Sequence, residues 1–137
     1  MYPEELVAPM RADLTNNGFK ELKSADEVSS TLDNLQGTAL LVVNSVCGCA
    51  AGSARPGVLQ SLDGDKKPAR LLTVFAGQEV EAVAKAREFL LPYPPSSPSI
   101  ALFRDGELVH FIERHNIEGR TAEMIAANLT AAYDQFC

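Results

Sequence analysis

The chain has 137 residues, of which 46% are hydrophobic and 22% are charged, a balance typical of one globular domain (residues 1–137) rather than of a disordered chain. Its 12 basic and 18 acidic residues leave a formal net charge of −6, which argues against a nucleic-acid-binding protein and against a polybasic membrane anchor. Three cysteines are too few, and odd in number, for a disulfide scaffold.

The amino-terminal segment, MYPEELVAPMRADLTNNGF, has no basic start followed by an apolar run, so we expect no secretory signal. The longest apolar stretch, TALLVVNSV, is far shorter than the roughly 20 residues that span a bilayer. We therefore expect a cytoplasmic protein. In that compartment thiols stay reduced, and closely spaced cysteines are more often catalytic, redox-sensing or metal-binding than structural.

Two helices are predicted before the first strand. The first ends near Gly18 and has apolar residues at helical spacing, namely Val7, Met10 and Leu14. The second begins with a capping box formed by Ser24 and Glu27 and ends at Gly37. Its apolar face consists of Val28, Leu32 and Leu35.

Two buried strands and a distorted helix are predicted in the middle of the chain. Residues 38–46 (TALLVVNSV) and 70–76 (RLLTVFA) are continuous apolar runs, typical of strands covered on both faces. Between them, AAGSARPGVLQSL predicts a helix. Pro56 and two glycines should bend this helix or delay its regular part.

The last third of the chain predicts a helix, a proline-rich loop, a hairpin and a final helix. The helix over residues 79–91 has an apolar stripe of Val80, Val83 and Leu90, and the loop PYPPSSPS follows it. Residues 99–103 and 107–112 flank Arg104-Asp105-Gly106 and predict an antiparallel hairpin. The final helix begins near Thr121 and is expected to bury Ile125, Leu129, Ala132 and Phe136.

Strands separated by helices imply parallel crossovers, and the terminal hairpin adds an antiparallel edge. The predicted fold class is therefore α/β. We expect an αβα sandwich with a mixed, mostly parallel central sheet of four or more strands and an extra amino-terminal helix.

The segment Cys47-Gly48-Cys49 lies where the first buried strand ends and the next helix begins, the edge where reactive groups gather in α/β sheets. A helix amino terminus offers free N–H groups and a partial positive charge, which favour thiolate over thiol. Cys47 is therefore predicted to be the exposed nucleophile, and Cys49 the thiol that resolves a mixed disulfide by attacking Cys47. Gly48 is expected to let the backbone fold sharply enough to bring the two sulfurs together.

A disulfide across one residue should be strained and easily reduced, which suits a shuttle or an isomerase better than a strong reductant. Two other interpretations stay open for the pair: small buried residues at a strand end, or thiolate ligands of zinc or an iron–sulfur centre. The remaining ligand types are scattered rather than spaced as a second pair, so no metal site is predicted; they are His110, His115 and Cys137. Arg55, beyond the pair, is expected to be solvated rather than to support the thiolate.

Residues 94–106 (PPSSPSIALFRDG) place a proline before an apolar strand, followed by a Phe and a turn glycine. This arrangement resembles the thioredoxin pattern, in which that proline is cis, lies against the active-site cysteines and belongs to a loop that holds the substrate backbone. The resemblance implies that Pro98 is a cis proline and that Ser97, Pro98 and Gly48 contact substrate. An ordinary rigid turn is the alternative.

The segment VNSVCGCAAGSARPG, with the amino-terminal helices and the proline loop, resembles the bacilliredoxin family over essentially the whole chain. The resemblance implies a thioredoxin-like fold and removal of bacillithiol, a low-molecular-weight thiol, from its mixed disulfides with cytosolic proteins. Cys47 would accept the bacillithiol and Cys49 would be the resolving thiol, with bacillithiol as co-substrate and no metal or organic cofactor. One Gly between the cysteines and no preceding Trp depart from the thioredoxin motif and speak against strong general disulfide reduction.

Four hypotheses follow for the function. The first is a thiol–disulfide oxidoreductase that removes bacillithiol, and the second is a disulfide isomerase or oxidase with the same chemistry. The third is a thiolate metal-binding or metal-delivery protein, and the fourth is a thioredoxin-like binding module without catalysis, against which both cysteines argue. Cys137 is expected to be an inert terminal thiol, the alternative being a resolving or dimer-forming one, and His110 and His115 are expected to be ordinary strand or surface residues.

Overall fold

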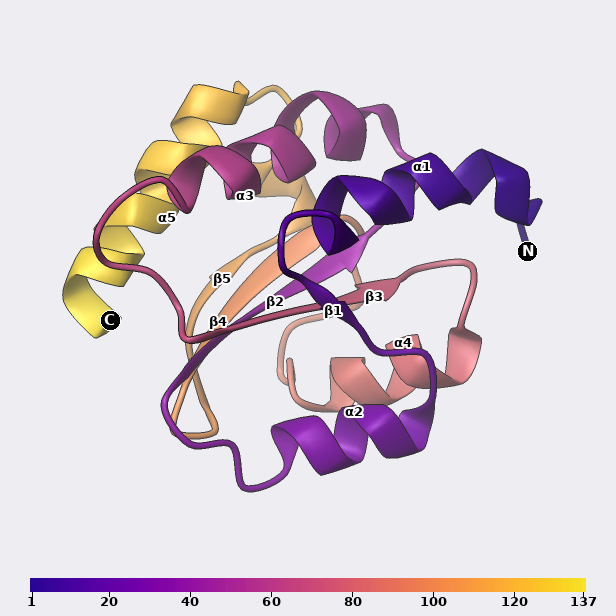
Figure 1. Cartoon of the computed structure of the whole chain (residues 1–137), viewed down its shortest axis with the longest axis horizontal. Helices are drawn as coiled ribbons and strands as arrows, with labels where there is room; N and C mark the ends of the chain where they lie inside the picture. The colour runs from indigo at the N-terminus through magenta and orange to yellow at the C-terminus, as the bar shows by residue number, and fades with distance from the viewer.

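The computed structural model describes all of residues 1–137 as a five-stranded sheet with helices on both faces (Figure 1). The regular elements follow in chain order: α1 (Glu4–Thr15), β1 (Lys20–Glu21), α2 (Ala25–Leu32), β2 (Thr38–Asn44), the π-helical turn η1 (Ala50–Ala54), α3 (Arg55–Ser61), β3 (Arg70–Phe75), α4 (Val80–Glu88), β4 (Ser99–Arg104), β5 (Glu107–Ile112), the 3-10 helix η2 (Arg114–Asn116) and α5 (Ala122–Phe136). The predicted α/β class is confirmed, and each predicted helix and strand has a counterpart.

The sheet is mixed, with the strand order β1-β3-β2-β4-β5. The strands β1, β3 and β2 pair in parallel, whereas β4 is antiparallel to both of its neighbours, so four strands run in one direction and β4 opposes them. The edge strand β1 is not predicted from the sequence. Its two residues pair with Leu72 and Thr73 of β3, and a segment this short has no alternating pattern of its own.

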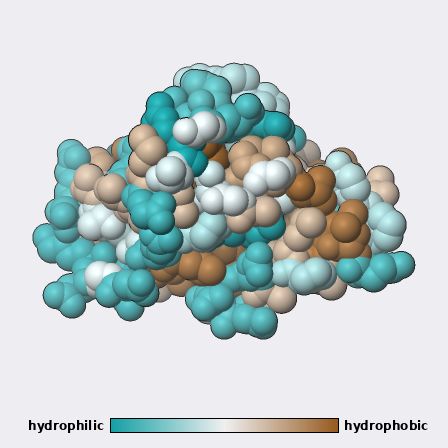
Figure 2. Space-filling model, turned by 90° about the horizontal axis from the view of Figure 1, so that it is seen from above, coloured by the Kyte–Doolittle hydropathy of each residue, from teal (hydrophilic) through white to brown (hydrophobic).

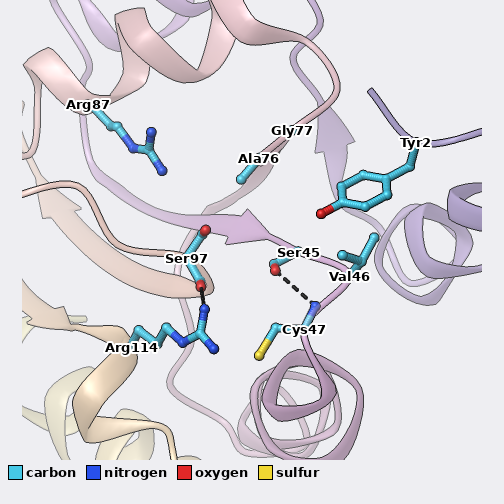
Figure 3. Close-up of a pocket in the computed structure, with 9 residues that line it drawn as sticks. All are labelled: Tyr2, Ser45, Val46, Cys47, Ala76, Gly77, Arg87, Ser97 and Arg114. Atoms are coloured by element: carbon cyan, nitrogen blue, oxygen red, sulfur yellow. Dashed lines mark hydrogen bonds between the residues drawn. The ribbon is translucent and has the colours of Figure 1, made fainter.

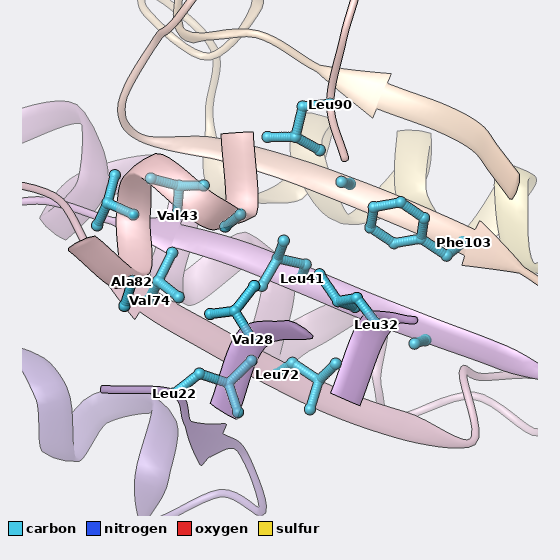
Figure 4. Packing of buried hydrophobic residues seen from close by; sticks show 14 of the residues in the cluster. Leu22, Val28, Leu32, Leu41, Val43, Leu72, Val74, Ala82, Leu90 and Phe103 are labelled. Carbon is cyan, nitrogen blue, oxygen red and sulfur yellow. The ribbon is translucent and has the colours of Figure 1, made fainter. Parts of the chain in front are cut away.

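Strand β2 lies at the centre of the sheet, and its side chains divide between two cores. Leu41 and Val43 belong to the core beneath α2 and α4 (Figure 4), and Leu40 and Val42 belong to the core beneath α3 and α5. All four side chains are at most 1% exposed, which confirms the prediction of a strand covered on both faces. Burial of a side chain of this size stabilises the fold by roughly 1.5–3 kcal/mol relative to exposure, so this central strand is held from both sides.

The helix after the cysteines is irregular at its start, as predicted. It opens with the π-helical turn η1 and becomes a regular α-helix only at Arg55, with Pro56 in the first turn. Proline has no N–H to donate and suits the first turn of a helix, which is why regular α-helical bonding begins here. Gly57, in the same turn, faces α5 so closely that a Cβ there would lie 2.6 Å from Cβ of Ile125.

The apolar stripe predicted on α4 is wrong at Val80, which is 67% exposed. The buried face of this helix is formed instead by three residues, Ala82, Val83 and Ala86. At about 100° per residue, Val80 falls at the margin of that face, and it lies in the first turn of the helix. The two alanines, which a search for large apolar residues overlooks, allow α4 to pack closely against α2.

Local hydrogen bonds confirm the predicted capping box and hairpin. The N–H of Glu27 donates to Oγ of Ser24 over 3.1 Å, although the Glu27 carboxylate accepts from the N–H of Lys23 rather than from that of Ser24. In the hairpin turn, Asp105 and Gly106 have positive φ values of 51° and 84°. The Asp105 carboxylate also accepts a hydrogen bond of 2.8 Å from the N–H of Gly37, which ties the turn to the loop before β2.

On the face shown in Figure 2, hydrophilic residues alternate with small apolar patches. None of the helices has the length and apolar character needed to cross a membrane.

Helix α5 begins at Thr121, whose side-chain oxygen accepts a hydrogen bond from the N–H of Met124, as predicted. Phe136, at the end of this helix, was expected to be buried but is only half-buried.

Candidate active site

The cysteine pair lies just after the carboxyl end of β2, from which Ser45 and Val46 separate it, in the position predicted. Cys47 and Cys49 are both half-buried free thiols, and their sulfur atoms lie 2.7 Å apart. The N–H groups of Ala50 and Ala51 donate to the carbonyl oxygen of Cys47 over 2.9 Å and 3.3 Å, so the first helical turn begins at the pair itself. This arrangement brings both sulfurs to the amino terminus of the helical segment.

Gly48 is exposed, and the sharp turn expected of it does not require glycine. Its φ is not positive, and a Cβ at this position would meet nothing within 4 Å. The sulfurs approach each other because the backbone enters a helical turn, in which any residue fits. The expectation about the conformation of Gly48 is therefore wrong, and the residue leaves open surface beside the thiols.

The two thiols differ in acidity. Burial by itself raises the pKa of Cys47, but hydrogen bonds from Cys49 and the positive charge of Arg114 outweigh it, and the pKa of Cys47 is lowered from its ordinary value. Burial and the neighbouring Cys47 raise the pKa of Cys49 to about 11. The opposite pKa shifts favour a thiolate at Cys47 and a protonated thiol at Cys49.

Arg114, in η2 after the hairpin, is a site residue that sequence reasoning missed. Its Nη1 donates to the carbonyl oxygen of Ser97 over 3.2 Å, and its Nε donates to Glu118 over 2.6 Å. The side chain lies beside Cys47 in Figure 3. No local pattern marks an arginine 67 residues after Cys47, so only the course of the chain through the sheet reveals it.

The proline loop reaches the site as the thioredoxin pattern implies. The Ser97–Pro98 peptide bond is cis, and Ser97 lines the same pocket as Cys47 (Figure 3). Pro98 is buried, and β4 begins at the next residue. A second cis bond, Leu91–Pro92, lies earlier in the loop and was not predicted.

Arg55 is buried, and the expectation that it is solvated is wrong. Its Nη1 donates to Oδ1 of Asn44 and to the carbonyl oxygen of Ser45, both over 2.9 Å, and its Nε donates to Asp13 over 3.0 Å. Oγ of Ser45 in turn accepts a 3.0 Å hydrogen bond from the N–H of Cys47. Arg55 is buried because polar groups at this end of β2 lie beneath α1 and α3, away from water. The guanidinium supplies the hydrogen-bond donors that these buried oxygens need.

A pocket of about 500 Å³ opens beside Cys47. Its lining includes Tyr2, Ser45, Arg87, Ser97 and Arg114 (Figure 3). The backbone of Tyr2 is held there by Gln78, which accepts from its N–H over 2.7 Å and donates to its carbonyl oxygen over 3.1 Å. The lining of the pocket is mostly polar, and Cys47, the thiol with the lowered pKa, faces it.

The other residues considered from the sequence do not line this pocket. Nε2 of His110 lies 2.6 Å from the side-chain oxygen of Asn128, and His115 is exposed. Cys137 is exposed at the end of α5. No group of three or more His, Cys, Asp or Glu residues is placed to hold a metal ion, so the pair Cys47 and Cys49 has no further ligand beside it.

The arrangement of strands and helices defines a thioredoxin-fold protein. Mitochondrial thioredoxin 3 from Saccharomyces cerevisiae aligns with a TM-score of 0.59 at 14% identity, over 90% of this chain and 98% of that one. A thioredoxin from Fasciola hepatica aligns with a TM-score of 0.58 at 15% identity, over 87% of this chain and all of the other. At such identities the likeness concerns the fold alone.

Sequence similarity identifies the family. The family model described as "Disulphide isomerase" matches residues 2–137. A bacilliredoxin from Cytophaga hutchinsonii is 62% identical over 135 residues, which are 98% of this chain and 99% of that protein. A bacilliredoxin from Halalkalibacterium halodurans is 55% identical over 136 residues, covering 99% of this chain and 94% of that protein. The chain belongs to the bacilliredoxin family and is a thiol–disulfide oxidoreductase.

Proposed function

We propose that the protein removes bacillithiol from mixed disulfides with protein cysteines, using Cys47 as the nucleophile and Cys49 as the resolving thiol. One observation supports this most directly: the two sulfurs are 2.7 Å apart and their pKa values are shifted in opposite directions. A thiolate beside a protonated thiol is the arrangement that two successive thiol–disulfide exchanges need. The name of the relatives, bacilliredoxin, supports bacillithiol as the small thiol.

The first exchange transfers the small thiol to the protein. The Cys47 thiolate attacks the bacillithiol sulfur, a Cys47–bacillithiol disulfide forms, and the bond to the modified protein breaks. The electron pair of that bond leaves with the protein sulfur, which takes a proton from solvent. The lowered pKa of Cys47 favours this step because only the thiolate attacks.

The second exchange releases bacillithiol. Cys49 gives up its proton and attacks the sulfur of Cys47, so a Cys47–Cys49 disulfide forms and bacillithiol leaves as a thiolate that takes a proton. Two molecules of low-molecular-weight thiol then supply the two electrons that restore the dithiol. In a one-thiol route, a free bacillithiol attacks the Cys47 adduct and leaves as the symmetrical disulfide.

We further propose that Gly48, Ser97 and Pro98, which surround the thiols, contact the substrate. Gly48 leaves open surface beside the sulfurs, and Ser97 and the cis Pro98 stand where a thioredoxin-like protein holds the substrate backbone. The exchange needs no metal or organic cofactor, since sulfur chemistry alone moves the electrons. We place the protein in the cytoplasm, where its partners would be cytosolic proteins that carry bacillithiol.

A disulfide isomerase is the second candidate, because the family model is described by that activity. It would use the same attack by Cys47, directed at a disulfide within a protein rather than at a mixed disulfide. Reactivation of a scrambled disulfide-containing protein tests it. Recovery of activity that depends on Cys47 supports isomerisation, and recovery at the uncatalysed rate rejects it.

The main test is mass spectrometry of the protein after exposure to a bacillithiol-modified substrate protein. We expect wild-type protein to unmodify the substrate, Cys47→Ser to leave it modified, and Cys49→Ser to accumulate a bacillithiol adduct on Cys47. Cys137→Ser is the matched control and should behave as wild type. Release of bacillithiol by Cys47→Ser would reject the nucleophile, and full turnover by Cys49→Ser without an adduct would establish the one-thiol route.

A further inference from the structure

The pocket beside Cys47 has a charge opposite to that of the protein. The chain has a formal net charge of −6, yet the charged side chains that line the pocket are both arginines, Arg87 and Arg114, and no acidic residue lines it. They come from opposite walls, Arg87 from α4 and Arg114 from η2, and both guanidinium groups point into the space near Ser97 (Figure 3). Such a convergence of two cations attracts an anion.

Arg87 has no partner within the protein. The structure gives its side chain neither a hydrogen bond nor an ion pair, and its Nε is buried without an acceptor. Burial lowers the pKa of this guanidinium, which shows that its charge is desolvated without compensation. A half-buried arginine that nothing in the protein satisfies is stabilised when an anionic ligand supplies the acceptor.

Arg114 is partly engaged and still has donors to offer. Its Nε pairs with Glu118 and its Nη1 with the carbonyl oxygen of Ser97, which leaves Nη2 without a partner in the protein. The two bonds fix the guanidinium at the edge of the pocket next to Cys47. Nη2 can donate one charge-assisted hydrogen bond to an anion in the pocket, and the unengaged guanidinium of Arg87 offers the paired N–H donors that match the two oxygens of a carboxylate.

We infer that this pocket binds a carboxylate of the low-molecular-weight thiol, with Arg87 and Arg114 as the residues that select it. The inference rests on the proposed function, because the small thiol becomes bonded to Cys47 in the first exchange. Since Cys47 lines the pocket, the rest of that thiol lies within it. A volume of about 500 Å³ accommodates a small organic thiol bonded to Cys47, so we assign the carboxylate to the small thiol rather than to the substrate protein, and the experiment below separates the two.

A pair of matched mixed disulfides tests the inference. The same substrate protein is modified with 3-mercaptopropionate or with its uncharged analogue 3-mercaptopropionamide, and kcat/KM is measured for each. In wild type we expect the carboxylate form to be preferred. In Arg87→Gln the ratio of the two kcat/KM values should fall about tenfold, the loss typical of one charge-assisted hydrogen bond. Arg87→Lys, which keeps the charge, should restore part of the ratio.

The matched control is Arg70→Gln, which removes an exposed arginine at the start of β3, outside the pocket. It should leave both rates as in wild type. The inference is overturned if Arg87→Gln, folded as judged by circular dichroism, keeps the wild-type ratio. A loss of equal size for both disulfides also overturns it, because Arg87 would then act on the substrate protein and not on the carboxylate of the small thiol.

An alkylation measurement separates this inference from the proposed function. The rates at which iodoacetate and uncharged iodoacetamide alkylate Cys47 are compared, with modification followed by mass spectrometry. A ratio that falls about tenfold in Arg87→Gln supports the anion pocket even where no mixed disulfide is turned over, in which case the proposed function alone fails. A ratio unchanged by Arg87→Gln rejects the pocket and leaves the proposed function standing.

Discussion

Arg55 donates a 2.9 Å hydrogen bond to the carbonyl oxygen of Ser45, two residues before Cys47. The same guanidinium holds the side chain of Asn44, and Oγ of Ser45 accepts from the N–H of Cys47. The turn that presents the thiol is thus fixed from α3 by a buried cation. The position of this turn is therefore determined by buried hydrogen bonds of Arg55 and not by the conformational freedom of Gly48.

Replacement of Arg55 by methionine should lower the free energy of unfolding by about 2–3 kcal/mol, because buried oxygens of Asn44 and Ser45 lose their donor. Urea denaturation measures it. The comparison variant Asp13→Asn should lose less than about 1 kcal/mol, since the carboxylate at the other end of the Arg55 pair is 54% exposed. Equal losses in the two variants would contradict the buried network.

The pH dependence of Cys47 alkylation should reflect its lowered pKa. Only the thiolate reacts, so the lowered pKa of Cys47 moves the midpoint of the rate profile below the ordinary value for a cysteine thiol. Replacement of Arg114 by glutamine removes a positive charge that favours the thiolate and should move the midpoint upward. Stopped-flow alkylation with iodoacetamide across pH 5–10 checks both statements.

Arg70→Gln, which removes an exposed arginine away from the thiol, should leave that profile unchanged. Cys49→Ala should also move the midpoint upward, because it removes the hydrogen bond from the Cys49 side chain that lowers the pKa of Cys47. A midpoint that is the same in wild type and Arg114→Gln would remove the guanidinium from the activation of Cys47.

Substitution of Gly57 by alanine should destabilise the contact between α3 and α5. The added Cβ would lie 2.6 Å from Cβ of Ile125 and 2.9 Å from the carbonyl oxygen of Ala122, so the helices must move apart. We expect a loss of about 2 kcal/mol in the free energy of unfolding, measured in urea. Gly52→Ala is the control: nothing lies within 4 Å of its Cβ position, and stability should stay equal or rise by up to about 1 kcal/mol.

Removal of the cap of α5 should have a smaller effect. Thr121→Ala deletes the oxygen that accepts from the N–H of Met124, and the expected loss is about 1 kcal/mol of unfolding free energy. Thr130→Ala, an exposed position within the same helix, removes the same side chain where it caps nothing. Thermal unfolding of the two variants gives the comparison, and a Thr121→Ala protein as stable as Thr130→Ala would contradict the cap.

Features that depend on neighbouring residues were predictable from the sequence. The continuous apolar run of β2 indicated a strand buried on both faces, Ser24 and Glu27 indicated a helix start, and Asp105-Gly106 indicated a hairpin turn. The position of Cys47 and Cys49 at the end of that strand followed from the same local patterns. Each of these features is determined by contacts a few residues apart, which periodicity and capping residues encode directly.

Features that depend on distant residues were predicted wrongly or not at all. Arg55 was expected in solvent because no local pattern shows that α1 and α3 close over polar groups at the end of β2. The short strand β1 exists only through its pairing with β3, and Val80 was assigned to a buried face that alanines occupy. In each case burial is decided by which elements pack together, and the side chain itself does not show this.

By itself, the sequence determined an acidic α/β protein with a thiol pair at a strand end and a proline before β4. The tertiary structure alone decided what surrounds that pair. Arg87, Ser97 and Arg114 come from three separate segments and meet Cys47 only because the sheet and its helices bring them to one edge. The physical reason is that hydrophobic periodicity reflects contacts within one helix or strand. The charge and shape of a pocket depend instead on side chains from several elements that only the fold brings together.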